Sequence, residues 1–234
     1  MAIKKLIVNA DDFGQSEGIN KGIIQAHEHG IVTSASLMVR YPAAIEAADY
    51  SKNNPALGIG LHIDLGEWIY NVGNWVPLYI VVSLDDISAV KNEINNQLES
   101  FYRIMGRKPT HIDSHQHIHL TESILPLVID IAKDLDVTLR RCSKKVHYCG
   151  DFYGQSEDGS PYHSAISAEG LKKIISTLPD GITELACHPA LNNDIKTMYG
   201  LERGMEVNSL CDHSVHKAIA DSNIELCSFE GIAF

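Results

Sequence analysis

The sequence predicts an α/β fold built on a parallel β-sheet, and three observations support this prediction. Seven short apolar segments that are typical of strands alternate with about six helical patterns along the chain. Ionisable residues follow directly after the apolar residues of five of these strands, as they do where strand ends converge on a functional site. The 234 residues contain no repeat or linker, so we expect one domain over residues 1–234.

The strands are predicted from short apolar runs between turn residues. Residues 5–10, for example, form a continuous apolar run of the kind found in buried parallel strands. Because strand–helix–strand units cross over in one hand, the carboxyl ends of such strands meet at one edge. The predicted strands cover residues 5–10, 32–39, 57–62, 111–114, 137–140, 183–188 and 224–229.

The helices are predicted from apolar residues that repeat every three to four positions. Gly30 ends the first helix, and Pro42 opens the second. One face of the long third helix consists of apolar residues, namely Ile87, Val90, Ile94, Leu98 and Phe101. The predicted helices cover residues 17–29, 42–50, 84–105, 122–135, 168–178 and 209–222.

Three segments, residues 66–83, 143–162 and 192–204, are predicted to be irregular. The first holds both tryptophans of the chain, Trp68 and Trp75. It is either a loop packed over apolar surface or a rim of aromatic side chains against which a sugar ring stacks.

Residues 111–119 are unusually rich in histidine. Four of the twelve histidines and one aspartate fall within these nine residues. If the segment begins as a strand, alternation puts His111, Asp113 and His115 on one face. A solvated, histidine-rich turn is the alternative. Because histidine is the commonest metal ligand, we favour a metal or proton-transfer site.

Other predicted strands also end in ionisable residues that could act in catalysis or bind a metal ion. Asp11 and Asp12 follow the first strand, and two adjacent carboxylates there are costly unless they are paired or bind a cation. A turn with a helix cap is the alternative, but it accounts for one aspartate more easily than for two. His62, Arg140 and His188 follow three further strands. Taken singly, His62 could be a structural histidine and Arg140 a surface arginine.

Composition excludes several classes of partner. A formal net charge of −11 argues against nucleic acid or an anionic membrane as a partner, since both require a basic face. No apolar run has the length of a membrane span, and the first residues lead into a strand rather than a signal peptide. The five cysteines are odd in number and scattered, which predicts reduced thiols in a cytoplasmic protein.

Four sequence blocks carry a family resemblance: residues 9–14 (NADDFG), 60–62 (GLH), 109–115 (PTHIDSH) and 186–189 (ACHP). They resemble the YdjC-like carbohydrate deacetylases, of the chitooligosaccharide deacetylase type. The resemblance implies a distorted or incomplete (β/α) barrel with about seven mostly parallel strands. It also implies a divalent metal ion, removal of an acetyl group from an N-acetylated sugar, and a homodimer. The Asp-Asp pair in the first block is also similar to that of NodB-type deacetylases, where one aspartate is the base and the other is a metal ligand.

The resemblance assigns roles residue by residue. Asp12, His62 and His115 would bind one metal ion, and Asp11 would be the general base. His188 would be the general acid, a role that suits an imidazole with a pKa near neutrality. Arg140 would pair with Asp11. The family implies Mg²⁺, whereas this ligand set suits zinc or another transition metal. No role is assigned to His111, Asp113, His117 and His119, of which His117 and His119 either support the ligands or begin the next helix.

Two other function classes remain open at the level of the sequence. One is a different single-metal hydrolase on a barrel, of the phosphoesterase or amidohydrolase-like kind, since one fold hosts many chemistries. The other is a non-catalytic sugar-binding protein. The sugar itself, and whether it is phosphorylated, depend on loops whose structure the sequence does not predict.

Overall fold

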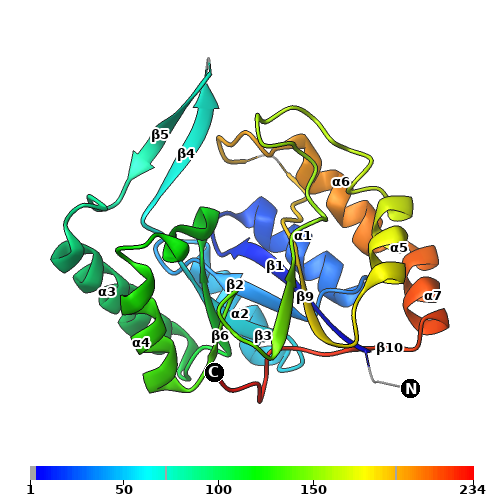
Figure 1. Ribbon diagram of the computed structural model, residues 1–234, viewed down its shortest axis with the longest axis horizontal. Helices are drawn as coiled ribbons and strands as arrows, with labels where there is room; N and C mark the ends of the chain where they lie inside the picture. The colour runs from blue at the N-terminus through cyan, green and yellow to red at the C-terminus, as the bar shows by residue number, and fades with distance from the viewer. Residues whose placement is uncertain (1–3, 72, 193) are drawn as a thin grey trace.

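The structure, a computed structural model, describes residues 4–71, 73–192 and 194–234. An eight-stranded sheet runs through its centre (Figure 1). Seven strands follow the order β7-β6-β3-β2-β1-β9-β8, and β10 pairs with β1 beside this path. The strands are β1 (Lys4–Phe13), β2 (Ser34–Leu37), β3 (Gly58–Ile63), β6 (His111–Ser114), β7 (Thr138–Leu139), β8 (Val146–Cys149), β9 (Gly181–Cys187) and β10 (Ile224–Leu226).

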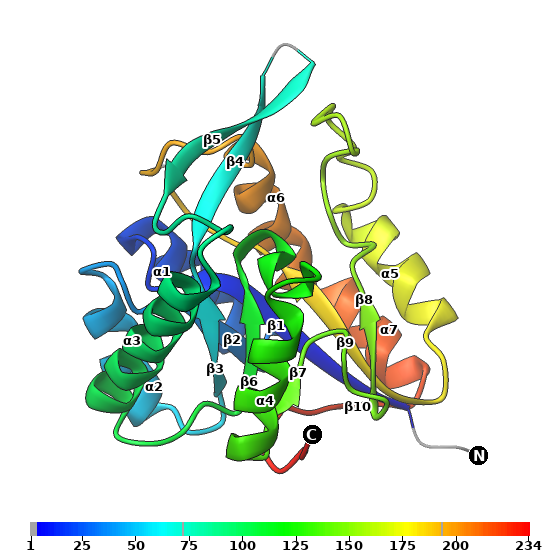
Figure 2. The ribbon, with the colours of Figure 1, turned by 60° about the vertical axis from the view of Figure 1, so that its left-hand side comes forward.

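The sheet confirms the predicted fold class. Every pair of neighbouring strands that the structure describes in it is parallel. The sheet is strongly curled, as the two views of Figures 1 and 2 show. Within the described residues no ladder joins the edge strands β7 and β8, so the barrel is incomplete. All seven predicted strands are present.

Helices cover the outside of this curled sheet (Figure 2). On one side α3 packs against α2 and β3, and α4 packs against β7; on the other, α1 contacts β1 and α6, and α5 contacts α6 and α7. The helices are α1 (Glu17–Glu28), α2 (Ala44–Asn53), α3 (Ile87–Met105), α4 (Leu125–Leu135), α5 (Ala168–Thr177), α6 (Leu201–Leu210) and α7 (His213–Asp221).

Helix α3 shows why these segments are helical. Asp86 caps its first turn by accepting a hydrogen bond from the backbone N–H of Ala89. Gly106, with φ of 72°, ends it in the left-handed conformation that glycine adopts without strain. Val90, Ile94 and Phe101, which share one face, are fully buried. The apolar face predicted from the sequence is therefore the face that packs on the sheet.

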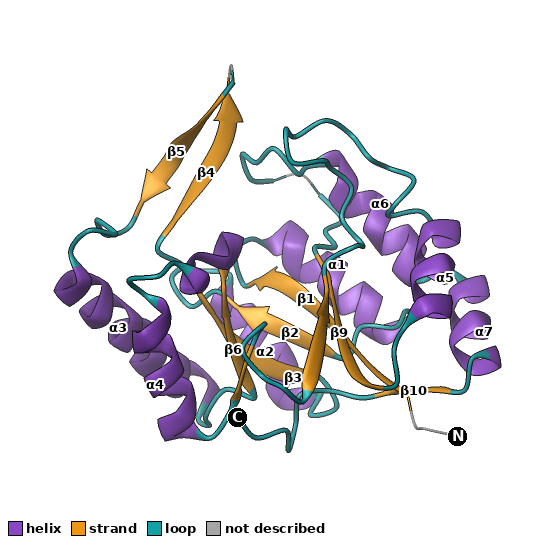
Figure 3. Cartoon of the chain, in the orientation of Figure 1, coloured by secondary structure: helices purple, strands orange, loops and turns teal. Residues whose placement is uncertain are grey.

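Five predicted segments differ from the structure. Residues 66–83 are not a loop but contain an antiparallel hairpin, β4 (Gly66–Asn71) and β5 (Asn74–Ile80), seen clearly in Figure 3. Residues 143–162 contain strand β8 of the main sheet, and residues 192–204 contain the start of α6. The helix predicted over 209–222 is divided between α6 and α7. A 3₁₀ segment (His115–Leu120) also precedes α4, which begins later than predicted.

The hairpin and the irregular segments gather at one end of the sheet. Figures 1 and 2 show β4 and β5 projecting from the same end as the loops that follow β8 and β9, while the two chain termini lie at the opposite end. This is the end at which the carboxyl ends of the parallel strands meet. Among the described residues, no helix has the length and apolar character required to span a bilayer.

Candidate active site

A cavity of about 400 Å³ opens at the carboxyl ends of the strands. This volume lies within the range of small-molecule binding sites, about 300–1,000 Å³. Five of the six predicted site residues line it, and the sixth, Arg140, lies buried behind Asp11. The side chains that line the cavity include Asp11, Asp12, His62, Glu67, Trp75, His115, His117, Arg141, Tyr148, Tyr153, His188 and Arg203.

Asp11 and Asp12 both face this cavity because the end of β1 is irregular. In a regular strand, adjacent side chains point to opposite faces. The register between β1 and β2 shifts between Ala10 and Phe13, and Asp12 has a positive φ of 69°. Such a conformation is uncommon for residues other than glycine but is several-fold enriched in aspartate. The irregularity turns two neighbouring carboxylates toward one site.

Asp12, His62 and His115 bring three candidate metal-binding atoms within 4.8 Å of one another. Oδ1 of Asp12 lies 3.4 Å from Nε2 of His62 and 3.0 Å from Nδ1 of His115. Donors bound to one ion at 2.0–2.1 Å are separated by about 3 to 3.4 Å. Nε2 of His62 is buried and has no hydrogen-bond partner among the described residues. Both the spacing and the unpartnered nitrogen fit a divalent ion.

His62 is oriented by Asp113, its neighbour across the pair of strands β3 and β6. Nδ1 of His62 lies 2.7 Å from Oδ1 of Asp113. A proton on Nδ1 leaves the lone pair of Nε2 free, as in the carboxylate–histidine–metal arrangement of many metalloproteins. His115 is supported more loosely, with its Nε2 3.7 Å from the Glu67 carboxylate of the hairpin.

The carboxylates make this site attractive to a cation. Burial lowers the pKa of His62, but Asp113 and Asp12 outweigh it and raise that pKa to about 10. Burial likewise lowers the pKa of His115, but Asp12 and Glu67 outweigh it and raise that pKa to about 9. In the absence of a metal ion, both imidazoles are therefore doubly protonated and positively charged at neutral pH. A divalent ion would replace those protons in the same negative field.

Arg140 gives Asp11 a fixed orientation. Its guanidinium donates two hydrogen bonds to Asp11, at 2.6 and 2.7 Å, and a third to Oε1 of Glu184 at 2.6 Å. It also lies 2.9 Å from Oδ2 of Asp113. Burial raises the pKa of Asp11, but Arg140 outweighs it and holds that pKa below its ordinary value. Arg140 is thus a buried cation shared by three carboxylates, not a surface arginine.

This position of Arg140 bears on a second cluster of possible metal ligands, formed by Asp11, His62 and Asp113. The guanidinium of Arg140 already lies between the two carboxylates of that cluster. The cation that these carboxylates require is therefore present in the protein itself. Asp12 also has a cationic partner, Arg203, but that contact uses Oδ2 alone, and Oδ1 faces the two imidazoles. Asp12, His62 and His115 are therefore the better candidate set of metal ligands.

His188 also lines the cavity, beside Asp11. Its Nε2 lies 3.8 Å from Oδ2 of Asp11, and its Nδ1 is buried without a hydrogen-bond partner in the described part of the chain. Burial lowers the pKa of His188 to about 4, although Asp11 and Asp12 oppose this shift. The imidazole is therefore neutral in the resting protein rather than titrating near neutrality. The rings of Tyr153 and Tyr199 meet it edge-on.

Helix α6 contacts both Asp12 and His188. Nη2 of Arg203 donates to Oδ2 of Asp12 at 2.6 Å, and Nη1 lies 3.4 Å from the carbonyl oxygen of His188. One turn later, Glu206 accepts hydrogen bonds from the backbone N–H of His188 and from the hydroxyl of Tyr199. Burial raises the pKa of Asp12, but Arg203 and His115 outweigh it and hold that pKa well below its ordinary value.

The other histidines of residues 111–119 do not belong to the cluster of Asp12, His62 and His115. The His111 ring is fully buried, stacks on Phe229 with 4.0 Å between centroids, and contacts Ser36. A Cβ on Gly60 would lie 2.4 Å from this ring, so the glycine is required for His111 to fit. His119 is bound to Ser114 at 2.6 Å. These two histidines are structural.

His117 lines the cavity, and its Nε2 lies 3.1 Å from the hydroxyl of Tyr148. Burial lowers its pKa to about 3, so this imidazole is neutral. With Gln116, it adopts a left-handed backbone conformation, at φ of 55° and 50° respectively. Each such residue costs about 1–2 kcal/mol. The chain therefore turns sharply directly after the candidate ligand His115.

Comparison with known proteins identifies the family of this chain. The family model described as YdjC-like protein matches residues 5–221. The chain belongs to the YdjC-like family. Two relatives, both named chitooligosaccharide deacetylase, come from Enterobacter sp. (strain 638) and Escherichia fergusonii. Each is 33% identical to this chain; the alignments cover 97% and 96% of this chain and 98% and 97% of the relatives.

A solved structure extends this likeness to three dimensions. It is the crystal structure of a protein from Enterococcus faecalis V583 that is described as a candidate cellobiose-phosphate cleavage protein. The two chains are 26% identical, each is covered completely, and the TM-score is 0.79. The incomplete barrel of this YdjC-like chain is therefore also found in a solved protein structure.

Sequence reasoning missed several charged residues of this YdjC-like site, namely Glu67, Glu184, Arg203 and Glu206. Glu184 lies within the apolar strand β9, and a carboxylate at that buried place is itself a signal that a cation lies nearby. Arg203 and Glu206 lie on α6, whose buried residues include three charged side chains as well as Val207 and Leu210. Without apolar periodicity, neither the start of this helix nor the role of its charges can be recognised from the sequence.

Proposed function

We propose that this protein is a metal-dependent carbohydrate deacetylase that hydrolyses the amide bond of an N-acetylated sugar, of chitooligosaccharide or related type. Family membership and the two relatives named chitooligosaccharide deacetylase support this proposal. The observation that carries it is the arrangement around Asp12. A cluster able to bind a metal ion is flanked on one side by a second, ionised carboxylate, Asp11, and beyond it by His188.

The proposed metal site consists of Asp12, His62 and His115. Two imidazole nitrogens and one carboxylate oxygen suit zinc or another transition metal, whereas magnesium prefers oxygen ligands. When bound, a divalent ion would make a water molecule more acidic and polarise the carbonyl of the acetyl group. We propose a single ion, because Arg140 already supplies positive charge between Asp11 and Asp113.

Asp11 is the proposed general base. Its carboxylate is ionised, and its two hydrogen bonds to Arg140 fix its direction toward the cavity. It takes a proton from the attacking water as the water oxygen bonds to the acetyl carbon. Because Arg140 lowers the pKa of Asp11, the protonated carboxyl readily gives that proton up again.

His188 is the proposed general acid. It is neutral at rest, so it must receive a proton during the reaction before it can donate one. Asp11 would supply the proton taken from water once Oδ2 and Nε2 of His188, now 3.8 Å apart, approach to hydrogen-bond distance. The proton then passes to the sugar nitrogen as the amide bond breaks. The second proton of the water stays on the new carboxyl group, so the step releases the amine and acetic acid, which at neutral pH become the ammonium ion and acetate. Glu206 and Arg203 hold the backbone of His188 in place for this transfer.

The experiment that tests this function is acetate release from a panel of N-acetylated mono-, di- and oligosaccharides, with and without a phosphate group. The purified protein is assayed as isolated, after chelation, and after addition of Zn²⁺, Co²⁺, Mn²⁺ or Mg²⁺ separately. We expect acetate release that chelation abolishes and a transition metal restores. Mass spectrometry of the products separates loss of the acetyl group from cleavage of a glycosidic bond. Glycosidic cleavage, or turnover that is unaffected by chelation, would contradict the proposal.

Two further proposals concern assembly and compartment. The family resemblance implies a homodimer, which light scattering of the purified protein would test. The five cysteines, all of them free thiols, support the expectation of a reducing compartment. Localisation of a tagged full-length protein would test that expectation.

A further inference from the structure

The incomplete barrel has an open side, where no ladder joins the edge strands β7 and β8 within the described residues. Both edge strands appear in Figure 2. Arg140 directly follows β7, and its hydrogen bond to Glu184 of β9 reaches toward the other edge. This cation is nevertheless fully buried. A buried charge at an opening of the sheet requires a cover as well as charged partners.

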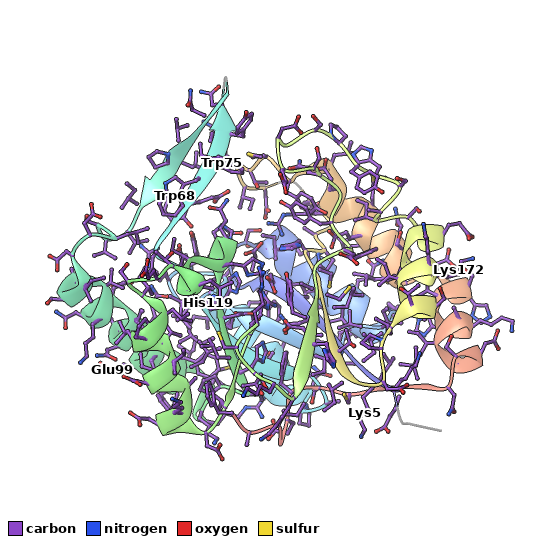
Figure 4. The ribbon with its side chains drawn as sticks, viewed as in Figure 1. Lys5, Trp68, Trp75, Glu99, His119 and Lys172 are labelled. Atoms are coloured by element: carbon purple, nitrogen blue, oxygen red, sulfur yellow. The ribbon has the colours of Figure 1, made fainter. Side chains whose placement is uncertain are left out.

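The 3₁₀ segment that follows β6 reaches both edges with its histidines. Nε2 of His119 lies 3.2 Å from the carbonyl oxygen of Arg140, and Nε2 of His117 lies 3.1 Å from the hydroxyl of Tyr148 in β8. Figure 4 shows His119 near the middle of the molecule, below the hairpin. These two histidines therefore connect the ends of β7 and β8, which share no ladder in the part of the chain that the structure describes.

The ring of Tyr148 lies over the guanidinium of Arg140. All three nitrogens of this guanidinium donate to carboxylates, so only the faces of the planar group remain to be covered. Tyr148 and Glu184 are direct partners in the register of β8 and β9, so their side chains share one face of the sheet. Cζ of Arg140 lies 5.6 Å from the centroid of the Tyr148 ring, within the range of a cation–π contact.

Other contacts hold the ring of Tyr148 in this place. The ring of His117 meets it edge-on, with 5.4 Å between centroids. Cζ of Arg141 lies 5.3 Å from the centroid of the Tyr148 ring. A Cβ on Gly150 would lie 3.0 Å from Cε1 of Tyr148, so a larger residue at position 150 would crowd the ring. The tyrosine is thus fixed through both its hydroxyl and its ring.

The cover is important because the pairing of Arg140 with Asp11 depends on the exclusion of water. Opposite charges attract strongly where the dielectric constant is low, and water that entered would compete for the same N–H groups. Asp11 is the proposed base. Displacement of a reacting group by about 1 Å can reduce the rate as much as 100-fold.

We propose that Tyr148 is a positioning residue, whose ring, anchored by His117, closes the open side of the barrel over Arg140 and so keeps Arg140 aligned with Asp11. This inference rests on the proposed function, because it takes Asp11 to be the base. Tyr148 also lines the cavity, so direct binding of the sugar by Tyr148 is the competing explanation.

Chemical modification of arginine tests the cover without any assay of activity. Phenylglyoxal reacts with accessible guanidinium groups, and tandem mass spectrometry of a chymotryptic digest identifies the modified residues. In the wild type, the exposed Arg141 should react and the buried Arg140 should not. In Tyr148→Ala, Arg140 should become modified as well. Tyr148→Phe keeps the ring and should keep Arg140 protected, as should the control His147→Ala, a change of the exposed neighbour on the same strand.

Kinetics separate positioning from binding of the sugar. Acetate release is measured on the β-1,4-linked disaccharide of N-acetylglucosamine with the metal-loaded protein. In Tyr148→Ala, kcat should fall about 10- to 100-fold with KM and metal content as in the wild type, because the base is misplaced while the sugar still binds. Tyr148→Phe should recover most of kcat, and His147→Ala should keep it.

Three outcomes would overturn the positioning role. The first is an Arg140 that stays protected in Tyr148→Ala. The second is a rise in KM with kcat unchanged, which would show that Tyr148 binds the sugar. The third is an equal loss of kcat in Tyr148→Phe and Tyr148→Ala, which would place the effect in the hydroxyl rather than in the ring. If circular dichroism shows that Tyr148→Ala does not fold, Tyr148→Val takes its place with the same expected results, because a β-branched side chain suits strand β8.

The two measurements also separate this inference from the proposed function. Modification of Arg140 in Tyr148→Ala, together with no acetate release from any sugar by the wild type, would support the cover and refute the deacetylase activity. Acetate release by the wild type with Arg140 protected in every variant would refute the cover and leave the activity standing.

Discussion

Asp113 lies opposite His62 in the parallel pair of strands β6 and β3, and its Oδ1 is 2.7 Å from Nδ1 of His62. The other oxygen of Asp113 accepts a hydrogen bond from Ser36 at 2.6 Å and lies 2.9 Å from Arg140. One buried carboxylate thereby connects His62, a proposed metal ligand, with Arg140, which orients the proposed base. The metal site and the acid–base pair share this support.

Asp113→Asn tests that connection. The amide keeps the shape of the carboxylate but no longer favours a proton on Nδ1 of His62, so Nε2 is a poorer ligand. Removing such a partner of a metal-bound histidine typically weakens metal affinity about 10- to 100-fold. We expect a loss of this size in competition with a chelator of known affinity, with the fold retained by circular dichroism. Unchanged metal affinity would show that Asp113 supports Arg140 but not His62.

His115→Ala tests the ligand assignment itself. The variant loses one of three ligands, so it should lose both bound metal and activity while it stays folded. His147→Ala is the control, because His147 is an exposed histidine outside the site. Metal content by mass spectrometry decides the matter, and full occupancy in His115→Ala would rule out this ligand set.

Substitution of the two adjacent aspartates should have different effects on the rate and on metal affinity. Asp11→Asn should keep its metal but lose about 10²- to 10⁴-fold in kcat, which is the usual contribution of a general base. Arg140 stays paired with Asp113 and Glu184 in this variant, so the fold should survive. Asp12→Asn should lose metal affinity first and recover part of its rate at high metal concentration. If the metal contents of the two variants come out the other way round, the roles are reversed.

Much of the site could be predicted because its residues end strands. Asp11, Asp12, His62, His115 and His188 follow the apolar residues of four strands, and parallel strands bring such positions together. The role of Asp113 could not be predicted, because it depends on the register of β6 against β3. Alternation places His111 on the same face as Asp113. Only the structure shows that this face lies against Phe229 and Gly60, where the ring is structural.

The parts of the fold that could not be predicted lack a simple apolar pattern. The hairpin of β4 and β5 is half exposed, so neither strand shows clear alternation of apolar and polar residues. Strand β8 is short, lies at the sheet edge and is mostly not buried. Helix α6 turns Glu202, Arg203 and Glu206 inward. These side chains have polar partners from other segments, such as Asp12 for Arg203 and the backbone N–H of His188 for Glu206. A single sequence does not show those partners.

The pH dependence of metal affinity follows from the raised pKa values of His62, about 10, and His115, about 9. Both imidazoles are protonated below these values, and both must lose a proton to bind a metal ion. Affinity should therefore rise with pH from 6 to 9, and binding at pH 7 should release about two protons. Calorimetry in buffers of different ionisation enthalpy measures this number. Release of no protons would mean that the histidines are not ligands.

The same shifts predict how the metal-free protein responds to pH. A group whose pKa is raised by folding stabilises the folded state. This contribution is complete below the pKa of the group in the unfolded chain, near 6.5 for histidine, and it is lost as the pH rises through the pKa of the group in the folded protein. The metal-free protein should thus lose stability between about pH 6.5 and 10. Saturating metal should reduce this loss, because bound ion takes the place of the protons. Thermal unfolding across this range, with and without metal, checks both statements.

His188 provides the test of acid–base chemistry. Burial lowers its pKa to about 4, so in the free protein it does not lose a proton near neutral pH. The profile of kcat/KM against pH should consequently show no alkaline limb near neutrality that belongs to His188. His188→Asn should keep its metal and lower the rate by about 10²- to 10⁴-fold without displacing either limb. Because an amine that is less basic requires less protonation to depart, the loss should shrink for substrates with such leaving groups. An equal loss for good and poor leaving groups would make His188 a positioning residue, and His117, the other neutral imidazole of the cavity, would be the next donor to examine.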